Sequence, residues 1–377
     1  MCVVGARPNF MKMAPILRAL AAHTPPLPAL LLHTGQHYDQ EMSQQIFADL
    51  GLPRPDLNLN VGSASHAQQT ADVMRSFEPA LDEHRPDCVL VVGDVNSTLA
   101  CTLVAVKKGV PVAHVEAGLR SFDRRMPEEI NRLLTDQIAD RLYTTERGAA
   151  RNLEREGIAA ERVAFVGNVM IDSLLTNKPH ARSPAETLKA HGLDPALLHR
   201  PSGYAVVTLH RPSNVDTDTA LRGIFSVLGE VATDMPLVIA LHPRTRTNLD
   251  RFGLNHLLDA KRVAILPPQG YLEMLGLVAG AALVLTDSGG LQEETTALGV
   301  PCLTLRDNTE RPITVEQGTN TLVGTDRNAI LAGVAAVLVG RGKRGRVPEL
   351  WDGQAAQRIA ADLWQWQQRR TPGASVA

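Results

Sequence analysis

Carboxylates gather in residues 114–132, HVEAGLRSFDRRMPEEINR. Glu116 ends an apolar run, and a helix restarting at Pro127 carries Glu128 and Glu129 in its first turn. Carboxylates at the exit of a strand and at the start of the next helix can face one small ligand from two sides, as proton transfer requires. Helix preference alone accounts for Glu129, since acidic residues favour a first turn, so Glu128 is the better candidate for chemistry.

Other polar side chains also come directly after apolar runs. Asp94 follows VLVVG; in isolation helix capping is the better explanation of Asp94, and only its place at the same edge as Glu116 favours chemistry. His210 beside Arg211 suits a diphosphate or a proton shuttle, and His242 occupies the same place after the next run. Neither histidine has cysteines or carboxylates at metal-ligand spacing, so no metal site is predicted.

The segment LTDSGGLQEET (285–295) has the composition of an anion-binding turn. Ser288, Gly289 and Gly290 leave backbone N–H groups open at the start of a helix, where the helix dipole also favours a phosphate. A capped helix after a glycine turn is the alternative. With a nucleotide bound at this turn, Glu294 is placed to reach a ribose hydroxyl pair.

Cations flank two further strand ends. GARPNFMK (5–12) puts Arg7 and Lys12 after the first apolar run, and a cation in a first helical turn opposes the dipole. An anionic ligand explains Lys12, and a solvated surface lysine explains it equally. RDNTERP (306–312) adds Arg311, for which a salt-bridged loop is the alternative.

Short apolar runs alternate with segments of helical period, which is typical of parallel α/β sheets. The expected strands are 2–4, 27–32, 88–92, 110–115, 141–144 and 163–166 in a first set, and 204–209, 236–241, 263–266, 282–286, 300–305 and 321–323 in a second. In open parallel sheets, ligands bind beyond the carboxyl ends of the strands. We therefore predict an α/β enzyme with two Rossmann-like doubly wound domains and an interdomain cleft.

The length of 377 residues favours two domains. The proline-rich, weakly periodic stretch 179–203 is the best boundary, giving domains 1–178 and 179–351. The tail, 352–370, has a helical apolar stripe. It is expected to pack as a helix that joins the first domain.

Composition excludes several classes. A formal net charge of −2 argues against nucleic-acid or anionic-membrane binding as the main role. The four cysteines are scattered and no run approaches the ~20 apolar residues of a membrane span, so a cytoplasmic protein is expected. GRGKRG (340–345) matches GxGxxG but follows a helical run and opens no helix, which disfavours an NAD enzyme.

The chain resembles the non-hydrolysing UDP-N-acetylglucosamine 2-epimerases. The resemblance rests on ten motifs in family order: GARPNFMKMAP, TGQHYD, GDVNST, HVEAGLRS, PEEINR, GNVMID, LHRPSNVD, LHPRT, TDSGGLQEE and RDNTERP. It implies a fold of the glycosyltransferase-B type, a homodimer, and interconversion of UDP-GlcNAc and UDP-ManNAc without NAD or metal. The implied route is elimination of UDP to a 2-acetamidoglucal, followed by readdition.

The resemblance also implies roles for individual residues. The acid/base carboxylates are Asp94, Glu116 and Glu128, with His210 acting on the departing UDP. The substrate-binding residues are Arg7, Lys12, His210, His242, Gln269, Ser288, Gly289, Gly290, Glu294 and Arg311. Two alternatives stay open: a 2-epimerase of a UDP-2,3-diacetamido-2,3-dideoxy uronic acid, and a glycosyltransferase of the same fold.

Overall fold

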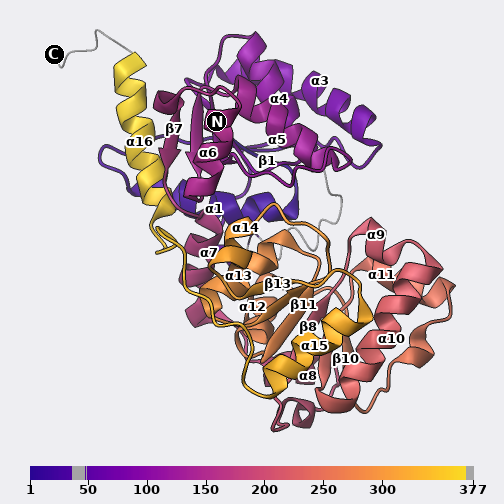
Figure 1. The fold of residues 1–377 in the computed structure, drawn as a ribbon. Coiled ribbons are helices and arrows are strands. Elements are labelled where there is room, and N and C mark those ends of the chain that lie inside the picture. Colours follow the sequence, from indigo (N-terminus) through magenta and orange to yellow (C-terminus); the bar gives the residue numbers. More distant parts are fainter. Residues whose placement is uncertain (36–46, 48, 371–377) are drawn as a thin grey trace. The chain divides into compact units, whose positions relative to one another are not determined.

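The computed structural model describes residues 1–35, 47 and 49–370, which form two compact units (Figure 1). Unit 1 comprises Met1–Thr176 and the chain from Glu349 onward, and unit 2 comprises Asn177–Pro348. The side chain of Arg7 and most of the TGQHYD motif (34–39) lie outside the described residues.

Unit 1 contains a seven-stranded parallel sheet in the order β3-β2-β1-β4-β5-β6-β7. The strands are β1 (Cys2–Val4), β2 (Leu31–His33), β3 (Leu57–Asn58), β4 (Val89–Val92), β5 (Val112–Ala117), β6 (Arg141–Thr144) and β7 (Val163–Phe165). The helices are α1 (Arg7–Ala22), α3 (His66–His84), α4 (Asn96–Lys107), α5 (Pro127–Ile138), α6 (Arg147–Arg155), α7 (Val169–Asn177), α16 (Ala355–Arg370) and a 3₁₀ turn at Ala160–Arg162.

Unit 2 contains a six-stranded parallel sheet in the order β10-β9-β8-β11-β12-β13. The strands are β8 (Ala205–Thr208), β9 (Leu237–Ala240), β10 (Val263–Leu266), β11 (Leu283–Thr286), β12 (Cys302–Thr304) and β13 (Asn320–Leu322). The helices are α8 (Pro184–Ala190), α9 (Pro212–Val215), α10 (Asp218–Asp234), α11 (Pro243–Arg251), α12 (Tyr271–Ala279), α13 (Gly289–Leu298), α14 (Pro312–Glu316) and α15 (Arg327–Leu338), with 3₁₀ turns at Lys178–His180, Pro195–Leu198 and Asn255–Leu257.

Both sheets reverse their direction of strand addition once. The reversal lies between β1 and β4 in unit 1 and between β8 and β11 in unit 2, so each sheet is doubly wound. The predicted pair of Rossmann-like folds is therefore confirmed. In such sheets the carboxyl ends of the strands at the reversal form the ligand-binding crevice.

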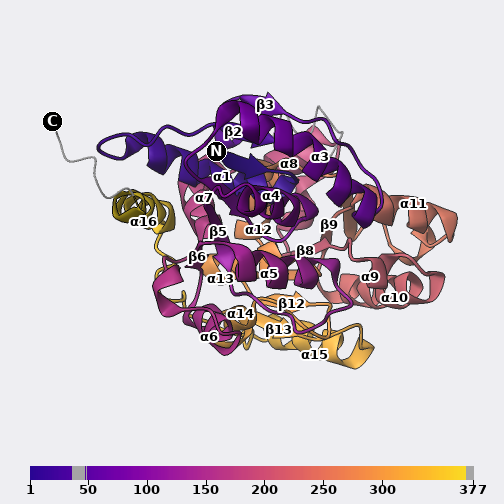
Figure 2. The same cartoon turned by 90° about the horizontal axis from the view of Figure 1, so that it is seen from above.

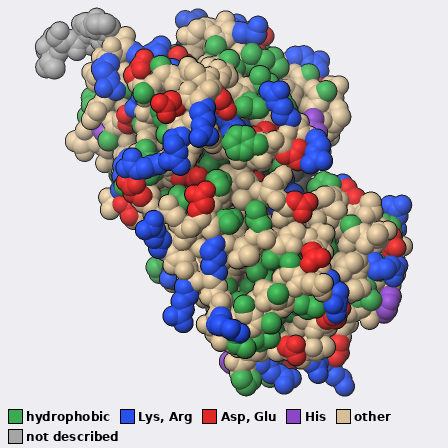
Figure 3. Space-filling model, viewed as in Figure 1, with side chains coloured by type: hydrophobic (Ala, Val, Ile, Leu, Met, Phe, Trp, Pro, Cys, Tyr) green, Lys and Arg blue, Asp and Glu red, His purple; other side chains and the backbone are tan. Residues whose placement is uncertain are grey.

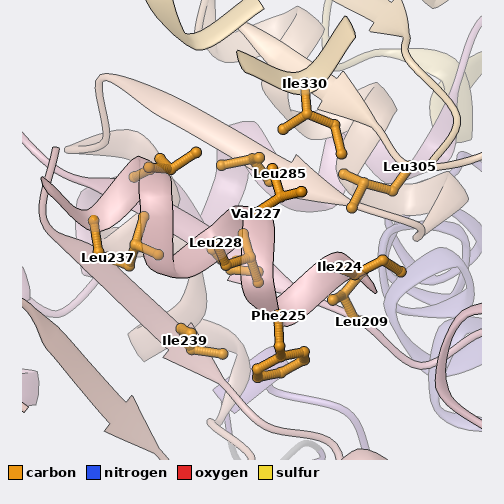
Figure 4. Close-up of a cluster of buried hydrophobic side chains, with 14 of the residues drawn as sticks. Leu209, Ile224, Phe225, Val227, Leu228, Leu237, Ile239, Leu285, Leu305 and Ile330 are labelled. Carbon is orange, nitrogen blue, oxygen red and sulfur yellow. The ribbon is translucent and has the colours of Figure 1, made fainter. Parts of the chain in front are cut away.

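The core of unit 2 shows why these residues form these elements. On α10, Ile224, Phe225 and Leu228 recur at helical spacing, and Figure 4 shows them in one cluster with strand residues such as Ile239 and Leu285. All five side chains are at most 1% exposed. Burying each one contributes about 1.5–3 kcal/mol, so one helix face fixes α10 against the sheet.

The C-terminal helix α16 belongs to unit 1, and Figure 2 looks along its axis. The carboxylate of Asp172 on α7 accepts hydrogen bonds from the first-turn amides of Ala355 (3.1 Å) and Ala356 (2.7 Å). Further along, Asp362 accepts from Arg141 Nε (2.7 Å) and from the Tyr143 hydroxyl (2.9 Å) on β6. The tail is thus held by polar contacts at the start and the middle of the helix.

The surface carries mixed charge. On the face in Figure 3, Lys and Arg side chains are interspersed with Asp and Glu, which agrees with the formal net charge of −2. Among the described residues, no helix is long and apolar enough to cross a membrane.

Candidate active site

Asn9, which is not among the predicted site residues, connects the two strands at the reversal in unit 1. Its Oδ1 accepts from the amides of Gly5 (3.2 Å) and Ala6 (2.9 Å), and its Nδ2 donates to the Val92 carbonyl (2.8 Å). The side chain therefore ties the turn after β1 to the end of β4. A polar residue beside proline at a helix start was the available signal.

Lys12 pairs with a carboxylate of its own unit. Its Nζ forms an ion pair with Glu116, and the side chains of Lys12 and Glu116 are only 7% and 2% exposed. Gly93 makes room for this lysine, because a Cβ there would lie 3.2 Å from Nζ, and its φ of +73° also favours glycine. The cation that opposed the helix dipole thus has a structural partner, and the surface-lysine alternative is wrong.

Glu116 adopts a strained backbone conformation at the end of β5. Its φ is +75°, and the pairing of β5 with β6 shifts register between Val115 and Ala117. A non-glycine residue in the left-handed region costs about 1–3 kcal/mol and persists where its surroundings over-determine it, commonly at functional sites. The bulge redirects the Glu116 carboxylate out of the strand pattern.

Asp94 is held by α5 and does not cap α4. Its carboxylate pairs with Arg132, and its backbone carbonyl accepts from Asn131 Nδ2 (2.9 Å). The N-cap of α4 is Val95, without a side-chain cap, so the capping alternative for Asp94 is wrong. With its side chain 23% exposed, Asp94 keeps access to a ligand.

Glu128 and Glu129 are neighbours with different surroundings. Glu129 accepts from the amides of Ser121 and Phe122 (both 2.9 Å) and pairs with Arg132 (2.7 Å). Burial alone would raise the pKa of Glu129, but these partners hold it below its ordinary value. Within the described part of the chain, the half-buried side chain of Glu128 has no hydrogen bond or ion pair. Glu129 therefore orders the loop and Glu128 remains available to a ligand.

A buried polar network lies at the same strand ends. His114 Nδ1 contacts Asp136 (2.7 Å), and His114 Nε2 contacts the Gly93 carbonyl (2.8 Å). Asp136 also accepts from Gly118 N (2.9 Å) and pairs with Arg120 (2.7 Å). Burial would raise the pKa of Asp136, yet His114, Arg120 and the Gly118 amide together lower it. No local sequence pattern predicts this network, because its members are far apart along the chain.

In unit 2, Asp287 at the end of β11 holds the turn after β8. Fully buried, it accepts from the amides of His210 (3.1 Å) and Arg211 (2.9 Å) and from Asn214 Nδ2 (3.1 Å), and it contacts His210 Nδ1 (2.9 Å). Although burial raises it, the pKa of Asp287 lies below its ordinary value because of His210 and these amides. Asp287 is therefore engaged across the sheet and does not cap α13.

His210 is positioned with one nitrogen engaged. Its Nδ1 faces Asp287 while its side chain stays 40% exposed, so the ring is fixed in place and accessible from solvent. The His242 ring lies 6.0 Å away between centroids, and its Nδ1 accepts from the Arg244 amide (3.2 Å) as the N-cap of α11. The two histidines predicted at adjacent strand ends thus lie together.

The start of α13 has the features of an anion site. Ser288 is its N-cap but makes no side-chain cap, so the amides of the first turn are left without an intrahelical partner. No acidic residue lies in that turn, and a Cβ at Gly289 would collide with the Glu310 carboxylate. Gly289 therefore allows close packing against Glu310, and an anion site at Ser288, Gly289 and Gly290 stays a prediction.

The remaining predicted residues in unit 2 are buried and anchored. Arg311 Nε pairs with Glu293 (2.9 Å), so the ion pair expected of an ordered loop is present. Gln269 Nε2 donates to the Pro267 carbonyl (2.8 Å). Burial, together with the charge of Glu294, raises the pKa of the Tyr271 hydroxyl well above its usual range, which places Glu294 beside that ring.

The chain is similar to known proteins over nearly its whole length. The family model described as UDP-N-acetylglucosamine 2-epimerase matches residues 19–363. The UDP-N-acetylglucosamine 2-epimerase of Methanocaldococcus jannaschii is 42% identical over 364 residues, covering 96% of this chain and 97% of the relative. The UDP-2,3-diacetamido-2,3-dideoxy-D-glucuronate 2-epimerase of Pseudomonas aeruginosa is 41% identical over 364 residues, covering 96% and 98%.

A solved structure agrees with these relatives. The Methanocaldococcus jannaschii UDP-GlcNAc 2-epimerase, crystallised with UDP-GlcNAc and UDP, aligns with a TM-score of 0.83 at 40% identity and covers 97% of this chain and 99% of that one. The family match spans far more than half of the sequence. The chain therefore belongs to the UDP-N-acetylglucosamine 2-epimerase family.

Proposed function

We propose that the protein catalyses the reversible epimerisation of UDP-GlcNAc to UDP-ManNAc at C2 of the sugar. The observation that carries the proposal is the set of three carboxylates at the carboxyl edge of the unit 1 sheet. Asp94 and Glu116 are each paired with a buried cation, and Glu128 has no such partner among the described residues. A family member with three such carboxylates has groups for both proton removal and proton return.

The chemistry proceeds by elimination and readdition. A carboxylate takes the proton from C2, the C2–H electron pair becomes the C1=C2 double bond of a bound 2-acetamidoglucal, and the electron pair of the C1–O bond leaves with UDP. UDP then re-adds at C1 while a carboxyl group returns a proton to the opposite face of C2. The carboxyl groups that remove and return the proton are those of Asp94, Glu116 and Glu128, with no face of C2 assigned to any one of them.

Unit 2 binds the nucleotide in this proposal. The open amides of Gly289 and Gly290 at the start of α13 and the exposed ring of His210 receive the negative charge that develops on the departing diphosphate. Gln269, Glu294, Arg311 and His242 line the remainder of the nucleotide site. In unit 1, Lys12, which is paired with Glu116, contributes a positive charge to the binding of the anionic substrate, and Arg7 is assigned to the diphosphate on the family resemblance alone.

The organisation of the chain is part of the proposal. We propose two functional domains. The first comprises residues 1–178 together with the helix 352–370, and the second comprises residues 179–351. The enzyme acts as a cytoplasmic homodimer, which sedimentation equilibrium of the purified protein tests.

A related substrate is the second candidate. The Pseudomonas aeruginosa relative acts on a UDP-diacetamido-glucuronate and is as similar to this chain as the UDP-GlcNAc enzymes are. That candidate predicts turnover of the uronate sugar with little turnover of UDP-GlcNAc.

Isotope exchange tests both candidates. Incubation with UDP-GlcNAc in D2O is expected to place deuterium at C2 of both epimers, as read by proton NMR. A parallel incubation with the diacetamido uronate compares the two rates. Folded protein that leaves both sugars unexchanged would contradict the proposed function.

A further inference from the structure

The imidazole of His114 links the two strand ends that carry Glu116 and Asp94. Its ring is fully buried on β5, beside Val91 and Leu142 in the sheet register. One nitrogen contacts the Gly93 carbonyl, which can only accept, so Nε2 donates. The other contacts Asp136, which already accepts from Gly118 N and Arg120 and is therefore a carboxylate, so Nδ1 also donates.

These contacts fix the backbone on both sides of the candidate chemistry. The Gly93 carbonyl belongs to the peptide group that leads into Asp94. Gly118 N, held by Asp136 at 2.9 Å, lies two residues after Glu116. The His114–Asp136 pair thus connects the peptide group that precedes Asp94 to the peptide group between Ala117 and Gly118, which follows Glu116.

The strain at Glu116 requires such a support. A φ of +75° is retained only where neighbouring contacts over-determine it. Core packing alone does not explain a buried histidine, because an apolar residue of the same size would leave the Gly93 carbonyl and Asp136 short of a donor.

We propose that His114 is a positioning residue for the reaction, acting through Gly93 and Asp136 to hold the carboxylates of Asp94 and Glu116. The inference rests on the proposed function of those carboxylates. His114 contacts backbone and Asp136 and takes no proton from the sugar. Displacement of a catalytic group by about 1 Å costs on the order of 100-fold in rate, and this sets the expected effect.

Two substitutions separate the two contacts. In His114→Asn the side-chain amide nitrogen of asparagine takes the place of Nδ1. This variant keeps the hydrogen bond to Asp136 and loses the hydrogen bond to the Gly93 carbonyl. In His114→Gln the amide nitrogen of glutamine takes the place of Nε2, which keeps Gly93 and loses Asp136. Leu142→Ala is the matched control, because Leu142 is the fully buried register partner of His114 and its side chain has no polar atom that could hydrogen-bond to either peptide.

For both His114 variants, kcat for C2 exchange in the full-length protein is expected to fall about 100-fold. KM is expected to stay within a few-fold, since unit 2 binds the nucleotide. Leu142→Ala is expected to lower the thermal midpoint while keeping kcat within two-fold. His114 variants with unchanged kcat, or a loss of kcat matched by Leu142→Ala, would overturn the inference.

Amide hydrogen exchange supplies a readout independent of activity. His114→Asn is expected to speed exchange at residues 93–95, and His114→Gln at 116–118, while Leu142→Ala affects neither segment selectively. Unchanged protection at both segments would refute the positioning role even if no sugar were turned over. A wild-type protein inactive on every sugar would instead refute the proposed function.

Discussion

Two adjacent glutamates show how strongly surroundings decide the role of a side chain. Glu128 and Glu129 occupy the same helical turn, yet Glu129 binds two loop amides and Arg132 while Glu128 has no such partner among the described residues. Local helix preference already favoured a structural Glu129. It gave no sign of the loop that Glu129 holds, because that contact depends on the tertiary path of residues 121–122.

Replacing each glutamate by glutamine is expected to separate chemistry from stability. Glu128→Gln should reduce C2 exchange by at least 100-fold with an unchanged thermal midpoint, since it removes a general acid or base. Glu129→Gln should cost about 1–3 kcal/mol of folding free energy, because it weakens the acceptor for Arg132 and for the loop amides, while Arg132 keeps its pair with Asp94. Exchange kinetics and calorimetry on both proteins check this, and equal effects on stability would contradict it.

The acid sensitivity of unit 2 follows from Asp287. Its folded pKa is depressed, so its contribution to stability is present above the unfolded pKa of about 3.9 and is lost as pH falls towards the folded pKa. Thermal unfolding between pH 7 and pH 3 should show this loss below about pH 4. Asp287→Asn should be less stable at pH 7 and should lose less stability on acidification. A variant with the wild-type slope would argue against this role.

At the scale of elements, the apolar runs in the sequence predicted where most strands lie, but several of the predicted strand ends differ from those in the structure. The runs 141–144 and 263–266 coincide with β6 and β10, whereas the run 27–32 contributes only its last two residues to β2. β3 was missed because two residues carry no alternation to detect. Helix α8 lies inside the stretch expected to be irregular, and its signal was the capping box formed by Ser183 and Glu186.

The docking of α16 yields a prediction at this scale. Asp362→Asn should destabilise unit 1 by about 1–3 kcal/mol, since it weakens the acceptor for the buried Arg141 guanidinium and the Tyr143 hydroxyl. Asp352→Asn is the control: its partner Arg358 is partly exposed, and a surface pair is worth about 0–1 kcal/mol. Chemical denaturation followed by unit-specific hydrogen exchange checks the difference. Equal effects of the two substitutions would show that Asp362 does not hold the helix.

At the scale of the whole molecule, the two sheets repeat one strand order and place polar residues at equivalent points. This was predictable because the runs alternate regularly and the polar residues follow them. The pairings within each site were less predictable. Lys12 with Glu116, Arg132 with Asp94, and His210 with Asp287 join residues 38 to 104 positions apart, and no local pattern encodes such contacts.

UDP is expected to stabilise unit 2. At 100 times its Kd, the ligand should add about 2.7 kcal/mol to the free energy of unfolding of that unit. Amide protection should rise at residues 286–292 and 208–214. His210→Ala should weaken the effect, while Glu128→Gln should retain it because it alters only unit 1. Protection absent from residues 286–292 would place the nucleotide elsewhere.

The interrupted path of unit 1 has a consequence for synthesis on the ribosome. Its last helix emerges only after the intervening Asn177–Pro348 segment has been translated, which takes about 10–30 s at typical elongation rates. During that interval the α16 residues that bind three side chains of unit 1 are absent, so no hydrogen bond from α16 reaches Asp172, Arg141 or Tyr143. The nascent chain thus completes its second unit before its first, and the surface of α1 that α16 contacts stays uncovered until translation is nearly over.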